Sequence, residues 1–209
     1  MAEMSKPQLI KQVEEFVKKS ITQHDGGHDW YHLNRVRNMA LHLQSAENKG
    51  DRFIVEIAAL LHDIDDNKFS KSEFPETEEK ITSFLKSLDI EDGIINEVVF
   101  INKNISFSKG LKPKNISPEF MIVQDADRLD AIGAIGIARA FNYGGFRNNP
   151  IYDPEGSSPS TIKHFYDKLL KLKELMNTDT GRKLAFERHE FLEIFLIQFF
   201  KECEFEKNY

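Results

Sequence analysis

The sequence has very little cysteine and no long apolar run. Cys203 is the only cysteine, so an internal disulfide is excluded and the composition is typical of a reducing compartment. The first residues, MAEMSKPQLI, have no apolar core of signal-peptide length, and no later window approaches the ~20 apolar residues of a membrane span. We therefore expect a cytoplasmic protein that has no membrane partner.

An excess of positive charge is also missing. The chain has 28 Lys and Arg residues against 34 Asp and Glu residues, which gives a formal net charge of −6. This balance argues against a nucleic-acid partner bound through a basic surface, because such binding depends on neutralising phosphates. A local basic pocket for a small phosphorylated ligand remains possible, so we expect a small-molecule substrate.

Two further absences define the expected fold. No Pro-, Gly- or Ser-rich linker divides the 209 residues, and a chain of this length can bury a substantial core, so we expect a single domain over 1–209. No segment alternates with period two, which predicts an all-α fold. Apolar spacing and helix-capping residues predict helices over about 5–23, 30–48, 54–66, 75–88, 92–100, 118–142, 159–177 and 180–206.

Three stretches lack a helical period, at about 68–74, 106–115 and 143–158. The last of them, YGGFRNNPIYDPEGSS, is rich in Gly, Asn, Pro and Ser. A loop of this length in a compact domain is uncommon unless it has a function, such as covering a site.

The predicted central helix, IVEIAALLHDIDD over 54–66, contains the first candidate site. Its apolar positions have the spacing of a helix that buries one broad side, and His62 and Asp63 stand together near its end. Burying an imidazole and a carboxylate in an apolar wall is costly unless something compensates, and a divalent cation is the most direct compensation. The dipeptide alone is weak evidence, because the sequence also contains His24-Asp25 and His28-Asp29.

Further ligands come from two other predicted helices. His32 lies in the first turn of the helix over 30–48, and the segment QDADRLD places Asp125, Asp127 and Asp130 among core-like residues. These aspartates are at i, i+2 and i+5, so one helix cannot point all three the same way. Asp127 and Asp130 are also compatible with simple ion pairs to basic neighbours.

The order His, His-Asp, Asp on successive helices resembles the HD-domain superfamily of metal-dependent phosphohydrolases. The strings GHDWYHLNRV, AALLHDI and QDADRLDAIGAIGIARAF are similar to a bacterial branch of small single-domain proteins that includes nucleoside triphosphate pyrophosphohydrolases. The similarity continues through NPIYDP and HFYDKLLKLKELMNT to the last helix. The resemblance implies an HD-type helical bundle with a metal core over about 28–142, on which the loop 143–158 and the helices 159–206 pack.

The resemblance also implies one divalent cation held by His32, His62, Asp63 and Asp127, with Asp125 as the alternative to Asp127. No His lies between His62 and His164, which favours a mononuclear site over the two-metal and three-metal sites of other HD proteins. Mixed nitrogen and oxygen ligands suit Mn, Co, Ni, Fe or Zn, whereas Mg prefers fewer imidazoles.

Asp66 is the candidate general base. It follows Asp63 by three residues, which is a neighbouring position on the same face if the helix persists. Related HD nucleotidases place an acidic residue at this offset against the attacking water, so the resemblance implies that Asp66 positions water. The alternative is that Asp65 and Asp66 form a solvated helix end.

Substrate-binding candidates are the basic residues around this site. Arg35 and Arg128 suit phosphate, although either can instead neutralise the ligand carboxylates. Lys109 suits a polyphosphate tail, and His28 suits either a phosphate or a role in orienting His32. The last two candidates, on the helix after the long loop, are open to a surface interpretation as well: His164 and Lys168.

These observations predict a divalent-metal-dependent phosphohydrolase that acts on nucleotides or other small phosphorylated metabolites. The resemblance makes a nucleoside triphosphate pyrophosphohydrolase the most specific option. The alternatives are a nucleoside monophosphatase and a non-catalytic, metal-bound sensor of a phosphorylated messenger.

Overall fold

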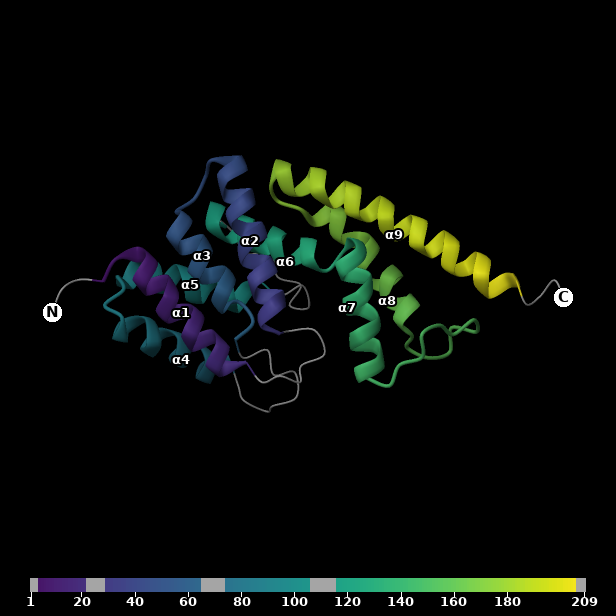
Figure 1. Ribbon diagram of the computed structural model, residues 1–209, viewed down its shortest axis with the longest axis horizontal. Helices are drawn as coiled ribbons and strands as arrows, with labels where there is room; N and C mark the ends of the chain where they lie inside the picture. The colour runs from purple at the N-terminus through teal and green to yellow at the C-terminus, as the bar shows by residue number, and fades with distance from the viewer. Residues whose placement is uncertain (1–3, 22–28, 65–73, 106–115, 206–209) are drawn as a thin grey trace. The chain divides into compact units, whose positions relative to one another are not determined.

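The structure is a computed structural model that describes residues 4–21, 29–64, 74–105 and 116–205. Within these ranges the chain is helical and contains no strand, which confirms the all-α prediction (Figure 1). The elements are α1 (Lys6–Ser20), α2 (Trp30–Glu47), α3 (Arg52–Leu61), α4 (Phe74–Ser87), α5 (Asp92–Asn104), α6 (Pro118–Asp130), α7 (Gly133–Phe146), α8 (Thr161–Asp167), the 3-10 helix η2 (Leu169–Leu175) and α9 (Asp179–Phe205).

The chain divides into two compact units, residues 1–126 and 127–209. The first unit contains α1 to α5 and most of α6, and the second contains α7, α8, η2 and α9. Each unit is described by itself below, and the expectation of a single domain over 1–209 stays a prediction. In the part of the chain that the structure describes, no helix combines the length and apolar composition needed to cross a membrane.

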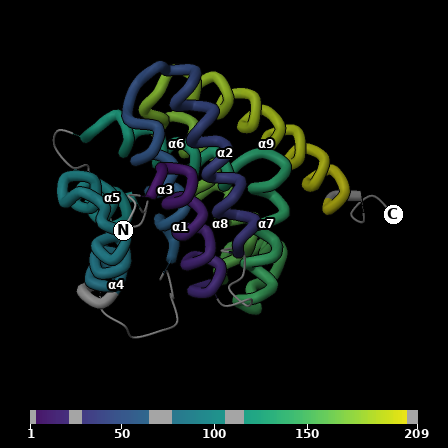
Figure 2. The backbone as a smooth tube through the Cα atoms, turned by 60° about the vertical axis from the view of Figure 1, so that its left-hand side comes forward, coloured from purple at the N-terminus to yellow at the C-terminus, as the bar shows by residue number. Residues whose placement is uncertain are grey.

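Helix α3 is the centre of the first unit, where it contacts α1, α2 and α5 (Figures 1 and 2). Every residue from Val55 to Leu61 is buried, and all of them except Glu56 are apolar. Its start is fixed by Asp51, whose carboxylate accepts hydrogen bonds from the amides of Phe53 at 2.7 Å and Ile54 at 3.2 Å. The predicted central helix is therefore confirmed, although it is shorter than expected.

A partly buried charge cluster ties α3 to the two helices before it. Arg37 of α2 donates from Nε to Glu56 of α3 at 2.8 Å and from Nη1 to Glu14 of α1 at 2.6 Å. Glu56 is only 7% exposed. Removing one partner of such a cluster leaves an uncompensated buried charge, which makes these contacts specific for one arrangement of the three helices.

The predicted helix over 118–142 is wrong: the structure has two helices, α6 and α7, separated at Ala131 and Ile132. Gly133 has φ +74°, in the left-handed region that favours glycine. A Cβ built there would lie 3.0 Å from Cγ of Arg188, so the position is crowded as well. The apolar period continues in phase across the break, which is why the sequence pattern suggested one helix.

Arginines from two other parts of the second unit satisfy the end of α6. Arg139 of α7 donates from Nη1 to the Asp130 carboxylate at 2.8 Å. Arg188 of α9 donates to the carbonyl of Leu129. The ion-pair interpretation of Asp130 is therefore confirmed, and these contacts supply the partners that carbonyls at a helix end require.

The predicted helix over 159–177 is also divided, into α8 and η2. The break comes at Lys168, whose φ of −133° is not helical. In η2 the apolar residues Leu169, Leu172 and Leu175 recur every three positions, which matches the three residues per turn of a 3-10 helix.

The predicted loop 143–158 begins later than expected, because α7 continues to Phe146. Asp153 organises the loop: its carboxylate accepts from the Ser158 amide at 2.7 Å, the Ser158 hydroxyl at 2.8 Å and the Ser157 hydroxyl at 3.0 Å. These hydrogen bonds, led by those from Ser158, lower the pKa of Asp153 to about 2. The loop is thus built around an anionic carboxylate.

Candidate metal centre

Three side chains of the first unit converge on one point. His32 comes from the first turn of α2, and His62 and Asp63 follow the end of α3. The Oδ2 atom of Asp63 lies 3.3 Å from Nε2 of His32 and 3.7 Å from Nε2 of His62. All three atoms lie within 4.8 Å of one another, which is the arrangement expected of ligands that share a cation.

This cluster is buried. The side chains of His32 and His62 are 0% and 1% exposed, and that of Asp63 is 13% exposed. Two imidazoles and a carboxylate at this depth are a costly combination in an otherwise apolar core, and a divalent cation would offset the cost. The donor set of two nitrogens and one oxygen suits a transition-metal ion.

The His62-Asp63 pair follows the end of helix α3, whereas the sequence predicted that the pair lies within the helix. Helix α3 ends at Leu61, His62 is its C-cap, and residues 62–64 form a turn. The expectation that the helix persists beyond the pair is therefore wrong, and with it the helical-face argument for Asp66. Asp66 itself lies outside the described residues.

The ring of His62 is held in one tautomer. Its Nδ1 lies 2.8 Å from the carbonyl oxygen of Ala59, an acceptor, so this nitrogen carries the proton. The lone pair is then on Nε2, which is the atom that faces Asp63. A backbone carbonyl that orients a histidine in this way is a common support for a metal ligand.

The position of His32 follows from the start of α2. Asp29 is the N-cap, and its Oδ1 accepts a hydrogen bond from the backbone amide of His32 at 2.8 Å. The rings of His32 and His62 meet edge to face, with centroids 5.3 Å apart. The predicted N-cap is confirmed, and it places His32 in the first helical turn.

Asn102 of α5 supports the site, and sequence reasoning missed it. Its Nδ2 donates to the carbonyl of Leu61 at 2.7 Å, which satisfies an end carbonyl of α3 directly before the His62-Asp63 pair. Asparagine is so common near helix ends that nothing in the sequence distinguishes this one. Its role arises from a contact between residues 41 positions apart.

The fourth ligand stays a prediction between Asp125 and Asp127. Asp125 is fully buried in the part of α6 that belongs to the first unit, whereas Asp127 is half-buried and begins the second unit. Two positions along a helix differ in direction by roughly 200°, so the two carboxylates point to different sides of α6. One of them at most faces any single cation.

Of four predicted phosphate-binding residues, the structure describes two, Arg35 and Arg128. Arg35 is half-buried on α2, three residues beyond His32 and therefore on a neighbouring position of the same face. Arg128 donates to the carbonyl of Leu175 within the second unit, so its guanidinium has a structural contact. Two further candidates, His28 and Lys109, lie outside the described residues.

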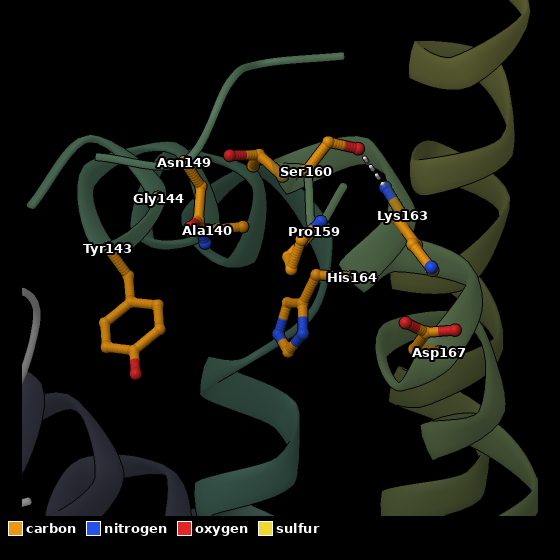
Figure 3. Close-up of a pocket in the computed structure, with 10 residues that line it drawn as sticks. Ala140, Tyr143, Gly144, Asn149, Pro159, Ser160, Lys163, His164 and Asp167 are labelled. Carbon is orange, nitrogen blue, oxygen red and sulfur yellow. Dashed lines mark hydrogen bonds between the residues drawn. The ribbon is translucent and has the colours of Figure 1, made fainter. Parts of the chain in front are cut away.

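The second unit contains a pocket of about 250 Å³ between α7, α8 and the loop before α8 (Figure 3). Its lining includes Tyr143, Asn149, Lys163, His164 and Asp167, and the rings of Tyr143 and His164 extend in the same direction in Figure 3. The predicted substrate residue His164 therefore lines a cavity. Lys168, predicted alongside it, is the C-cap residue of α8.

The pKa of His164 is lowered, first by burial and then by the charge of Lys168, although Asp167 opposes the shift. The imidazole is therefore neutral at pH 7, where it can donate one hydrogen bond and accept another. A role in substrate binding stays a prediction, but it would be that of a hydrogen-bonding group and not of a cation.

Comparisons with known proteins agree with this site. Residues 29–132 match the HD domain family model. The chain is 40% identical over 207 residues to the uncharacterised protein YpgQ of Bacillus subtilis, with 96% of this chain and 95% of YpgQ covered.

Solved structures give the same result. The crystal structure of YpgQ in complex with ADP has a TM-score of 0.76 and 38% identity, with 92% of this chain and 97% of that chain covered. A Bacillus thuringiensis protein described as an HD-superfamily hydrolase has a TM-score of 0.76 and 41% identity, with 96% and 100% covered.

The chain belongs to the HD-domain superfamily, and it is a metal-dependent hydrolase of that superfamily. The resemblance to the HD-domain superfamily and the HD-type all-α fold are thereby confirmed.

Replacing Asn102 with Ala should weaken metal binding. Loss of the hydrogen bond to Leu61 should lower the free energy of unfolding by about 1 kcal/mol and reduce Mn²⁺ affinity by roughly tenfold, because the turn that carries His62 and Asp63 loses its support. Isothermal titration calorimetry and urea unfolding measure the two effects. Asn104→Ala is the matched control, since the Asn104 side chain donates to the Phe100 carbonyl of its own helix, and equal Mn²⁺ affinity in both variants would contradict the prediction.

Replacing Asp63 with Ala should abolish metal binding. The cluster loses its only carboxylate among the three convergent residues, so Mn²⁺ affinity should fall more than about 100-fold while circular dichroism stays that of a folded helical protein. Metal analysis after dialysis checks the result. Asp92→Ala, at an exposed position on α5, should retain wild-type affinity, and full metal content in Asp63→Ala would remove Asp63 from the site.

Proposed function

We propose that this hydrolase acts on nucleotides, and specifically that it cleaves a nucleoside triphosphate to a nucleoside monophosphate and pyrophosphate. The observation that carries the proposal is the buried convergence of His32, His62 and Asp63. The resemblance of the sequence to a branch that includes nucleoside triphosphate pyrophosphohydrolases supplies the specific reaction. The similarity to YpgQ, which has been crystallised with ADP, supports a nucleotide as the ligand.

The proposed metal ligands are His32, His62, Asp63 and Asp127, with Asp125 as the alternative to Asp127. Four protein ligands on a cation that takes about six leave room for water and a phosphate oxygen. When bound, such a cation would lower the pKa of a water molecule and offset the charge of the phosphoryl group. The proposed cation is Mn, Co, Ni, Fe, Zn or Mg, and the imidazole ligands suit the transition metals better than Mg.

The protein's own residues then have separate tasks. His62 is held by the Ala59 carbonyl so that Nε2 faces the site. Asp66 is proposed to position or deprotonate the attacking water, and Arg35 to contact a phosphate from the helix that carries His32. Proposed substrate contacts beyond these are His28, Lys109, Arg128, His164 and Lys168.

An intracellular nucleotide as substrate is consistent with the charge of the chain. A net charge of −6 does not favour a polyanionic macromolecule, whereas a few local cations are enough for a triphosphate. A small phosphorylated substrate is thus the better match to this composition, and cytoplasmic localisation stays a prediction.

Product analysis tests the reaction. With Mn²⁺ and each nucleoside triphosphate, ion-exchange chromatography should show monophosphate and pyrophosphate in equal amounts, and orthophosphate should appear only after inorganic pyrophosphatase is added. Orthophosphate without the added enzyme, or release of phosphate from nucleoside monophosphates, would show a phosphatase instead. A nucleotide that raises the melting temperature without being cleaved would show a sensor.

Asp66→Ala separates catalysis from metal binding. If Asp66 positions water, the variant should keep wild-type Mn²⁺ affinity while kcat falls by roughly 10²–10⁴-fold, the usual range for loss of a general base. Steady-state kinetics and calorimetry on the same preparation measure both quantities, with Asp92→Ala as the control. Unchanged kcat would end the proposed role, and lost metal would make Asp66 a ligand instead.

A further inference from the structure

The pocket of the second unit is lined by small residues and by two aromatic rings. Ala140 and Gly144 lie four positions apart on α7, and therefore on neighbouring positions of one face of that helix. The rings of Tyr143 from α7 and His164 from α8 extend in the same direction (Figure 3), and both residues are half-buried. Small residues beside two partly exposed rings leave room for a flat ligand that stacks on a ring.

The size of the pocket suits one part of a nucleotide. Its volume is about 250 Å³, whereas pockets that enclose most of a drug-sized ligand usually have ~300–1,000 Å³. A nucleobase is a ligand of the smaller kind, and a whole nucleoside triphosphate is not.

The charges around the pocket do not select a phosphate. Lys163 and Asp167 lie at exposed positions four residues apart on α8, and their charges are opposite. Burial, followed by the charge of Lys168, lowers the pKa of His164, so its imidazole is neutral at pH 7. The lining therefore suits an uncharged ring with donors and acceptors at its edge better than it suits a polyanion.

Backbone hydrogen bonds fix the position of Asn149, which also lines the pocket. The amide of Asn149 donates to the carbonyl of Gly144, and the amide of Thr161 donates to the carbonyl of Pro150, both at 2.9 Å. Asn149 is thus held between the end of α7 and the start of α8. An asparagine side chain presents an acceptor and two donors in one plane, which is the pattern that pairs with the edge of a nucleobase.

We propose that this pocket binds a nucleobase, which stacks on the rings of Tyr143 and His164 while the side-chain amide of Asn149 pairs with its edge. We call these three residues the base pocket. The inference rests on the proposed function, because it names the base as the part of the nucleotide that this pocket takes. The three residues then determine which nucleoside triphosphate is preferred.

Nucleoside binding is the first test, because a nucleoside has no phosphate to cleave and reports on the pocket separately from catalysis. The Mn²⁺-loaded chain is titrated with adenosine, guanosine, cytidine and uridine, and binding is followed by ligand-observed NMR. At least one nucleoside should bind with a dissociation constant in the millimolar range or below, whereas ribose alone should not bind.

Removal of either ring should weaken that binding. Tyr143→Ala and His164→Ala should each raise the nucleoside dissociation constant at least ~5-fold, because the base loses a stacking surface. Tyr166→Ala is the matched control, since Tyr166 is an aromatic residue of α8 that is 49% exposed and does not line the pocket. Unchanged Mn²⁺ affinity in all three variants shows that the fold is kept.

Asn149→Asp tests selectivity, because it keeps the shape of the side chain and replaces its two donors with an acceptor. The ratios of kcat/KM among the four nucleoside triphosphates should change by roughly tenfold, the usual effect of one lost base-edge pair. A purely structural role would lower kcat/KM equally for all four. Asn148→Asp is the control, since Asn148 is an exposed neighbour outside the lining.

Absence of nucleoside binding by a chain that cleaves nucleoside triphosphates would overturn the proposal. Binding that both ring variants leave unchanged would overturn it too, because the base would then lie elsewhere. The same holds if these variants weaken the binding of inorganic triphosphate as much as that of a nucleoside, since the pocket would then be a phosphate site. Nucleoside binding without any cleavage would refute the proposed reaction and leave the base pocket in place, so the two failures are distinguishable.

Discussion

The site depends on a carboxylate held between two buried imidazoles. Oδ2 of Asp63 lies 3.3 Å and 3.7 Å from the Nε2 atoms of His32 and His62, in a core that otherwise consists largely of aliphatic side chains. Three groups with these donor atoms are costly to desolvate unless a cation joins them. The surrounding helices hold the three groups together, because each group lies at the start or the end of a helix.

Contacts at helix ends position the three side chains of the site. His32 is positioned by the N-cap of α2, while His62 and Asp63 follow the last turn of α3, where Ala59 orients the ring of His62 and Asn102 binds the carbonyl of Leu61. Side chains at such ends project beyond the packed body of the helix, so they reach a common point without interrupting the helical hydrogen bonds. The partly buried cluster of Arg37 with two glutamates then fixes α2 and α3 against α1.

In the second unit, polar contacts stabilise the end of α6 and a loop. Arg139 and Arg188 satisfy the end of α6, and Asp153 holds its loop through two serines. Gly144 lets α7 approach α8, because a Cβ there would lie 2.0 Å from the hydroxyl of Thr161. The pocket next to this contact is lined by the neutral imidazole of His164 together with Lys163 and Asp167, so it combines a hydrogen-bonding ring with groups of both charges.

The sequence by itself determined the helical class, the caps at Asp29 and Asp51 and the central apolar helix, because these depend on periodicity and on local hydrogen bonds. It also singled out His32, His62 and Asp63. The tertiary structure decided where α3 ends, where α6 gives way to α7 and which asparagine supports the site. Those features depend on contacts between residues distant in the chain, such as Arg188 with Leu129, and no local pattern records them.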